Sequence, residues 1–335
     1  MGILSPFDWF DRREWLEALG TEPVVQGERD HGTGTFEDWR MVSMVVALGG
    51  GGARGIAHLG ALEALQDRGV AFHRFVGVSI GALAAAVVAR DGDVRAAIQN
   101  VQQYLDEDLS ESCLVTPQPS SASGDGGLWG WYERVRRAMS AHMQVSRAVT
   151  RAGMLSDVPL RTAIERLIPN EIDIEELAIP TSIVAMDLTT GFRRVLETGP
   201  LRLALQASAA IPGLFPPVTW VDGNQLCDIG ILESLPTEIA RTYGQPVIAI
   251  DVGQKLDRDA QCQSAMEVML RVDDIGESYS RRAARSAADI LIRPEVGTIP
   301  WFDFGSPERL MQAGRESAER ACQSIDSCDR QPICS

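Results

Sequence analysis

The chain of 335 residues is short of basic side chains: 31 Lys and Arg stand against 46 Asp and Glu, which gives a formal net charge of −15 at pH 7. A surface of this charge repels the phosphate backbone, so nucleic acid is excluded as the main partner. The same charge argues against strong electrostatic attachment to anionic lipid. A local group of arginines does occur within residues 134–151, so the conclusion concerns the overall balance only.

Long apolar runs are also missing. The longest candidate, residues 82–89, is far shorter than the roughly 20 residues that a membrane-spanning helix needs. The first twenty residues mix acids, arginines and tryptophans and lack the apolar core of a secretory signal. We therefore expect a cytoplasmic protein.

The six cysteines form no CxxC pair, although three of them, Cys322, Cys328 and Cys334, lie close together near the end of the chain. A metal site made by these three is the alternative, but scattered reduced thiols are the simpler interpretation. We expect neither a metal ion nor a cofactor.

Aromatic residues are scarce at 6%, whereas glycine is plentiful with 31 residues. Such a composition favours helices packed closely on a sheet over an all-β sandwich, so the expected class is α/β. We divide the chain into an N-terminal extension (1–42), one domain (43–322) with a helical insertion at about 116–167, and a C-terminal tail (323–335). Apolar runs predict strands at 44–48, 75–78, 181–186, 193–196, 218–221, 247–252 and 289–292. Helical periodicity covers 56–66, 80–89 and about 307–322.

The sequence Gly77-Val78-Ser79-Ile80-Gly81 matches G-x-S-x-G. It stands between a predicted strand and a predicted helix, where such a motif forces the serine onto a sharp, exposed turn. The two glycines are needed because a side chain at either position would collide with the neighbouring strand or helix. The pattern predicts that Ser79 is a nucleophile.

A glycine-rich stretch, Gly50-Gly51-Gly52-Ala53-Arg54-Gly55, follows the first predicted strand and opens a helix. It also fits the dinucleotide-binding pattern G-x-G-x-x-G, which requires an acidic residue about 20 residues on, at the end of the next strand. That strand instead leads directly into the Ser79 turn. We therefore favour an oxyanion hole, in which exposed backbone amides stabilise a developing negative charge.

The sequence offers no ordinary histidine base to activate Ser79, because none of the four histidines lies beyond residue 142. In an α/β-hydrolase triad the histidine comes last in the chain, after the serine and the acid, so activation by imidazole would need an unusual chain order here. His58 is the histidine nearest to the motifs, and a packed or exposed helix residue without a catalytic role is the simpler interpretation of it. A carboxylate is the other base. Asp228 fits best, since it follows the strand at 218–221 and a turn; its rival Asp222 stands beside Gly223 and suits a turn.

Three blocks resemble the patatin-like phospholipase family in its bacterial branch: LGGGGARGIAHLGAL (48–62), GVSIGAL (77–83), and ASAAIPGLFPPV (207–218) followed by DIGILESLP (228–236). The resemblance covers roughly residues 43–320. It implies a three-layer α/β/α fold with a mostly parallel central sheet, and a Ser–Asp dyad without a catalytic histidine.

By this resemblance Ser79 is the nucleophile, Asp228 the general base, and Arg54 the basic residue of an oxyanion loop whose donors are Gly50, Gly51 and Gly52. Gly55, Gly77, Gly81 and Gly230 are its motif glycines. The implied substrate is a fatty-acyl ester, such as a phospholipid or lysophospholipid, with transient contact to a membrane surface. Nothing in the sequence determines the oligomeric state.

Two positions depart from the family pattern: Ile229 replaces a glycine, and Ser234 stands where Asn is common. If position 229 requires positive φ, a β-branched residue is strained there and Asp228 is displaced. This departure motivates the alternative of a weakly active lipid-binding or regulatory member. A second alternative is an acyltransferase that uses the same dyad.

Overall fold

The computed structural model describes residues 43–114, 156–253, 265–297 and 303–328, together with the single residues 256, 262 and 299. The predicted N-terminal extension, most of the helical insertion and the end of the C-terminal tail lie outside these residues and stay predictions. The same is true of the cysteine group near the C-terminus, since Cys334 is not described.

Eight strands of the described chain form one sheet, in the order β5-β6-β3-β2-β1-β7-β8, with β4 also paired to β3. The five strands from β3 to β8 in this order run parallel, while β4, β5 and β6 add antiparallel pairs at the β3 end. Their bounds are β1 Ser43–Leu48, β2 Ala71–Val78, β3 Thr181–Asp187, β4 Arg193–Leu196, β5 Val218–Thr219, β6 Gln225–Cys227, β7 Val247–Ile250 and β8 Ile290–Ile292.

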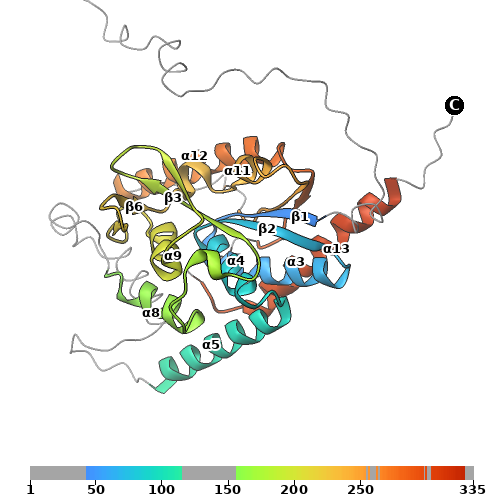
Figure 1. The fold of residues 1–335 in the computed structure, drawn as a ribbon, viewed down its shortest axis with the longest axis horizontal. Coiled ribbons are helices and arrows are strands. Elements are labelled where there is room, and N and C mark those ends of the chain that lie inside the picture. The colour runs from blue at the N-terminus through green and yellow to red at the C-terminus, as the bar shows by residue number, and fades with distance from the viewer. Residues whose placement is uncertain are drawn as a thin grey trace, which may run out of the picture. The chain divides into compact units, whose positions relative to one another are not determined.

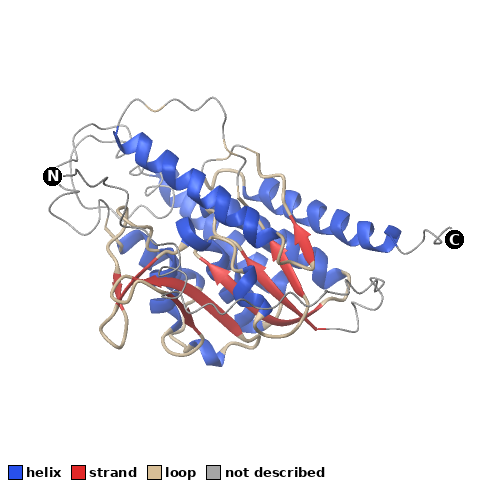
Figure 2. Cartoon of the chain, turned by 90° about the horizontal axis from the view of Figure 1, so that it is seen from above, coloured by secondary structure: helices blue, strands red, loops and turns tan. Residues whose placement is uncertain are grey.

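Helices cover both faces of this sheet (Figures 1 and 2). One face carries α3 Ile56–Asp67, α4 Ile80–Asp91, α5 Val94–Leu114, α8 Val158–Leu167, α9 Leu201–Ala209 and α13 Pro307–Cys328. The other carries α10 Gly230–Glu233, α11 Thr237–Arg241 and α12 Ala265–Arg285. Two short 3-10 helices, η1 Gly52–Gly55 and η2 Ile174–Glu176, complete the described elements. The predicted three-layer α/β/α fold is confirmed.

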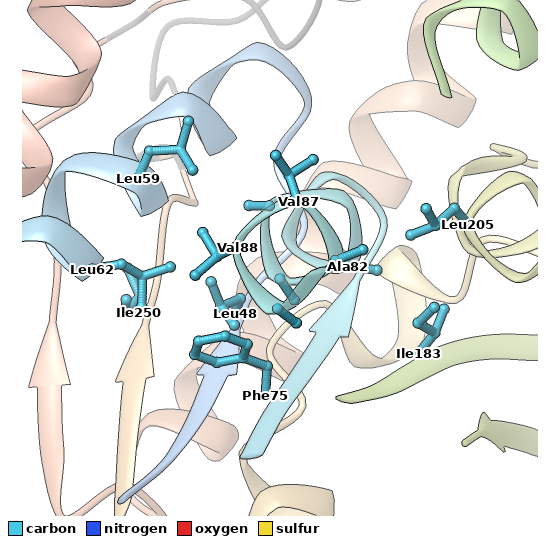
Figure 3. Close-up of a cluster of buried hydrophobic side chains, with 14 of the residues drawn as sticks. Leu48, Leu59, Leu62, Phe75, Ala82, Val87, Val88, Ile183, Leu205 and Ile250 are labelled. Atoms are coloured by element: carbon cyan, nitrogen blue, oxygen red, sulfur yellow. The ribbon is translucent and has the colours of Figure 1, made fainter. Parts of the chain in front are cut away.

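The central strands are apolar on both faces because both faces are covered. In β1, Met44, Val46 and Leu48 belong to the larger buried cluster, whereas Val45 and Ala47 belong to the smaller one on the α11 side. Figure 3 shows α4 in the larger cluster, with its Val88 near Leu48, Phe75 and Ile250 of the strands. The alanine-rich sequence of α4 lets this helix lie close to the sheet.

The C-terminal helix α13 packs on α3 with almost no space between the two backbones. A Cβ added at Gly60 would lie 1.8 Å from the carbonyl oxygen of Met311, and one at Gly314 would lie 1.9 Å from that of Ala57. Only glycine fits at these two crossing points, so α13 belongs to the folded domain. It continues to Cys328, six residues beyond the predicted end at Cys322.

All seven predicted strands are present, but some bounds differ. β2 begins at Ala71 rather than Phe75, and β5 ends at Thr219 rather than Val221. The short strand β6 was not predicted, since three residues give too little alternation to recognise. In the described part of the chain, no helix is both long and apolar enough to cross a bilayer.

Candidate active site

Ser79 occupies the turn between β2 and α4, in a backbone conformation that side chains rarely adopt. Its φ and ψ are 55° and −126°, and it is the only described residue other than glycine with positive φ. Such a conformation costs about 1–3 kcal/mol and persists only where the surroundings impose it. Strain at a single serine between a strand and a helix is typical of a nucleophile.

The two motif glycines allow this turn, as the sequence predicts. A Cβ at Gly77 would lie 2.5 Å from the Cα of Ala82, and a Cβ at Gly81 would lie 2.2 Å from the carbonyl oxygen of Leu48. Real Cβ atoms do not approach backbone so closely, so any side chain at either position would displace Ser79.

A second serine, Ser208, holds this turn in place and was not predicted from the sequence. The Ser79 amide donates to Ser208 Oγ at 2.8 Å, and the Ser208 hydroxyl donates to the carbonyl oxygen of Val184 at 2.7 Å. Ser208 is fully buried on α9. It lies within one of the family-like blocks, but its distance of 129 residues from Ser79 in sequence gave no signal of this contact.

Asp228 lies directly after β6, and its carboxyl group lies close enough to Ser79 for the Ser79 side chain to lower its pKa. Its Oδ1 also accepts the Gly230 amide at 2.7 Å, and its own amide donates to the carbonyl oxygen of Ala210 at 2.9 Å. Burial raises the pKa of this carboxyl group to about 6, although the hydrogen bonds from Ser79 and Gly230 act in the opposite direction. The structure thus brings the two predicted residues together.

The turn that follows Asp228 corrects the expectation of strain at Ile229. Ile229 has φ −90° and ψ −1°, an ordinary right-handed conformation, and its side chain is buried in the cluster on the α11 side. The premise of a positive φ is therefore wrong for this chain. Gly230 is the tight position, because a Cβ there would lie 3.0 Å from Asp228 Oδ1.

The glycine loop, residues 49–52, connects β1 to η1 and passes next to Ser79. A Cβ at Gly50 would lie 3.5 Å from the Ser79 Cβ. The Gly50 amide, however, donates to the carbonyl oxygen of Ser234 at 2.8 Å, so the prediction that Gly50 is an oxyanion donor is wrong. Gly51 and Gly52 have φ of 155° and 58°, and no acceptor for their amides occurs among the described residues. These two amides remain the candidate donors.

Arg54 contacts a backbone carbonyl of the glycine loop. Its Nε donates to the Gly51 carbonyl oxygen at 3.0 Å, its side chain is buried, and its Nη1 has no hydrogen-bond partner within the described residues. Burial lowers the pKa of this guanidinium to about 10, so Arg54 is charged at neutral pH. Gly55 is required for packing, since a Cβ there would lie 2.4 Å from the Ile80 side chain.

The two rival candidates have structural roles. His58 is fully buried on α3, and its Nε2 hydrogen-bonds the Gly49 carbonyl oxygen at 2.8 Å. Burial lowers the pKa of His58 to about 4, so the ring is neutral at ordinary pH. Asp222 pairs with Arg194 at 2.5 Å and accepts the Asn224 amide at 3.1 Å within a turn.

An apolar cavity of about 1110 Å³, open mouth included, begins at Ser79 and Gly52 and runs between α3, α4, α5 and α8. From α4 it is lined by Ile80, Leu83, Ala84 and Val87, which form one face of the helix. Eight residues of helix rise about 12 Å from Ser79 to Val87, so the cavity is deep.

Val101 of α5 and Leu167 of α8 also line the cavity. The Leu167 carbonyl accepts hydrogen bonds from Arg90 Nη1 at 3.2 Å and Asn100 Nδ2 at 3.1 Å, which join the ends of three helices there. No cluster of His, Cys, Asp and Glu suited to a metal ion occurs among the described residues.

The family model for the patatin-like phospholipases matches residues 46–241, which include Ser79, the glycine loop and Asp228. The chain belongs to the patatin-like phospholipase family.

Several relatives share most of this family domain. The chain is 26% identical to mouse patatin-like phospholipase domain-containing protein 6 over 299 residues, which cover 81% of this chain and 20% of that protein. Neuropathy target esterase sws of Drosophila melanogaster is 27% identical over 315 residues, 86% of this chain and 20% of that one. An uncharacterized NTE family protein of Mycobacterium tuberculosis is 27% identical over 309 residues, 84% and 47% respectively.

The chain therefore spans between a fifth and a half of the length of these relatives. Membership of the patatin-like phospholipase family supports lipid acyl hydrolysis as the general type of reaction.

Proposed function

We propose that this protein is a serine hydrolase that cleaves fatty-acyl esters, with phospholipid or lysophospholipid as substrate. The observation that carries the proposal is the pairing of a strained Ser79 with a buried Asp228 at the mouth of an apolar cavity. The name of one relative, neuropathy target esterase sws of Drosophila melanogaster, is that of an esterase and agrees with this proposal.

In the proposed mechanism the Asp228 carboxylate accepts the hydroxyl proton of Ser79 while Ser79 Oγ attacks the ester carbonyl carbon. The carbonyl oxygen becomes an oxyanion, to which the amides of Gly51 and Gly52 donate. The tetrahedral intermediate collapses, the proton passes to the departing alcohol, and an acyl-enzyme remains. Water then attacks the acyl-enzyme while Asp228 accepts a proton from it; Asp228 returns this proton to Ser79 Oγ as the acyl–oxygen bond breaks, and the free acid leaves.

The pKa of Asp228 suits this role. A carboxyl group with a pKa of about 6 is ionised at neutral pH, yet it is a stronger base than an exposed carboxylate. His58 is a poor candidate for this work, because its Nε2 bonds the Gly49 carbonyl oxygen and its lowered pKa of about 4 makes it a weaker base than Asp228.

The cavity determines the proposed substrate class. Its lining from α4 and α8 is aliphatic, as is usual for a site that binds an apolar ligand. A fatty-acyl chain fits such a lining, with its ester carbonyl at Ser79 and its alcohol portion towards the mouth. An ester at a membrane surface would be reached by transient contact with that surface.

The regulatory alternative rested on strain at Ile229, and Ile229 has an unstrained backbone. No described feature favours an acyl acceptor over water, so hydrolysis is the reaction that we propose.

Labelling with a fluorophosphonate probe tests this function. We expect the wild-type protein to be labelled and Ser79→Ala to be unlabelled, because the probe reacts with an activated serine. A circular-dichroism spectrum of Ser79→Ala that matches the wild type would show that the fold is intact. An unlabelled wild type, or equal labelling of both proteins, would contradict the proposal.

A further inference from the structure

Three consecutive carbonyls of the glycine loop accept hydrogen bonds from three basic side chains. His58 Nε2 bonds the Gly49 oxygen at 2.8 Å, Arg281 Nη2 donates to the Gly50 oxygen at 2.8 Å, and Arg54 Nε donates to the Gly51 oxygen at 3.0 Å. His58 and Arg54 follow the loop directly in sequence. Arg281 lies on α12, 231 residues from Gly50, and belongs to no motif.

Peptide geometry gives these bonds a consequence on the opposite side of the loop. The carbonyl of one residue and the amide of the next belong to one planar trans unit and point in opposite directions. Arg281 therefore holds the unit that contains the Gly51 amide, and Arg54 holds the unit that contains the Gly52 amide. These are the two amides without an acceptor among the described residues.

Arg281 is itself held firmly. Its Nη1 donates to Asp251 Oδ1 at 2.6 Å, its Nε donates to Glu277 Oε1 at 2.9 Å, and its side chain is 3% exposed. The guanidinium packs directly on the backbone of Gly253, where a Cβ would lie 2.7 Å from Arg281 Nε. Burial disfavours the charge of Asp251, but Arg281 and Arg285 outweigh it and lower the pKa of that carboxyl group.

We propose that Arg281 is a positioning residue for the oxyanion hole: through the Gly50 carbonyl it orients the Gly51 amide and places a positive charge behind it. The proposal rests on the proposed function of Ser79. Arg281 touches no substrate. A donor that is fixed before the reaction stabilises the oxyanion without reorganisation, and hydrogen bonds in series strengthen one another.

Arg285 provides a matched control for a purely structural role. Its Nε donates to the other oxygen of the same carboxylate, Asp251 Oδ2, also at 2.6 Å. In the described part of the chain no hydrogen bond joins Arg285 to the glycine loop. Replacement of either arginine breaks an ion pair with Asp251, but only replacement of Arg281 releases Gly50.

The experiment compares kcat and KM for a short-chain ester in the full-length wild type, Arg281→Gln and Arg285→Gln, with the melting temperature of each. We expect kcat of Arg281→Gln to fall by about 100-fold, the usual effect of a lost oxyanion donor, while KM stays near the wild-type value. Arg285→Gln should melt earlier but keep its kcat.

A conservative variant covers the case in which Arg281→Gln does not fold. Arg281→Lys keeps the charge beside Asp251 but lacks the fork that reaches two acceptors, so its kcat should fall by about tenfold. Low concentrations of guanidinium chloride should restore part of the kcat of Arg281→Ala, and sodium chloride at the same ionic strength should not.

Equal kcat in Arg281→Gln and Arg285→Gln, or wild-type kcat in Arg281→Lys, would overturn the positioning role while Ser79 still reacts with the probe. A wild type that neither reacts with the probe nor hydrolyses esters would overturn the proposed function, and the positioning role with it. The two failures are thus distinguishable.

Discussion

On one face of the sheet the surroundings of Ser79 are apolar, and on the other they are charged. Towards α4, α5 and α8 the cavity is lined mostly by aliphatic side chains. Towards α12 the glycine loop contacts the buried Arg281, which pairs with the buried Asp251 and the half-buried Glu277. The apolar side can only select what binds, whereas the charged side fixes the groups that meet a developing charge. Substitutions on the two sides should therefore change different kinetic constants.

Asp228→Asn should produce the largest effect on the polar side, a loss of about 1,000-fold in kcat with little change in KM, because a general base contributes 100- to 10,000-fold. Stopped assays on a short-chain ester measure both constants. An equally large rise in KM would show that Asp228 also contributes to substrate binding. The polar side would then not act on kcat alone.

The stability of the same variant tests the raised pKa of Asp228. The folded-state pKa of Asp228, about 6, lies above the ordinary aspartate value of 3.8, so the folded wild type binds more protons than the unfolded chain and loses stability as pH rises through this window. Asn carries no charge. The melting temperature of Asp228→Asn minus that of the wild type should therefore be larger at pH 8 than at pH 4.

The pH dependence of the wild type should give the next largest effect. Only ionised Asp228 can accept the Ser79 proton, so kcat/KM should fall about tenfold per pH unit below about 6 and level off above it. A pH series with a neutral ester measures this profile. A rate that is flat from pH 5 to pH 8 would contradict the role of Asp228.

Val87→Phe tests the apolar side and should have the smallest effect. Val87 lines the cavity about two helical turns from Ser79, so a larger side chain there reduces the space for a long acyl chain, and kcat/KM for a palmitoyl ester should fall by about tenfold, the scale of one or two displaced methylenes. The acetyl ester should be hydrolysed at the wild-type rate, which serves as the internal control. An equal loss for both esters would mean that the variant disturbs Ser79 itself.

The sequence was sufficient for the parts of the site that depend on neighbours in the chain. The collisions at Gly77 and Gly81 follow from a serine placed between a strand and a helix, and they are present. The late Asp228 was reached from the missing histidine and from family resemblance. Its pairing with Ser79 depends on β6, which is too short to recognise by alternation.

The remaining parts arise only when distant segments meet. Ser208 and Arg281 contact the site across 129 and 231 residues, and nothing near either residue indicates a partner. Gly50 was counted as a donor because its amide looks exposed in sequence, but the fold brings the Ser234 carbonyl to it. The strain expected at Ile229 depended on a backbone angle that sequence does not give.

The crossing of α3 and α13 through Gly60 and Gly314 bears on how this domain is combined with others. The helix α3 begins directly after the 3-10 turn that contains Arg54, so the last helix of the domain is joined, backbone to backbone, to the element behind the glycine loop. A gene fusion that adds a module after Cys328 leaves this contact whole. A fusion that replaces the chain from Pro307 onward would remove α13 and expose the surface of α3 around Gly60.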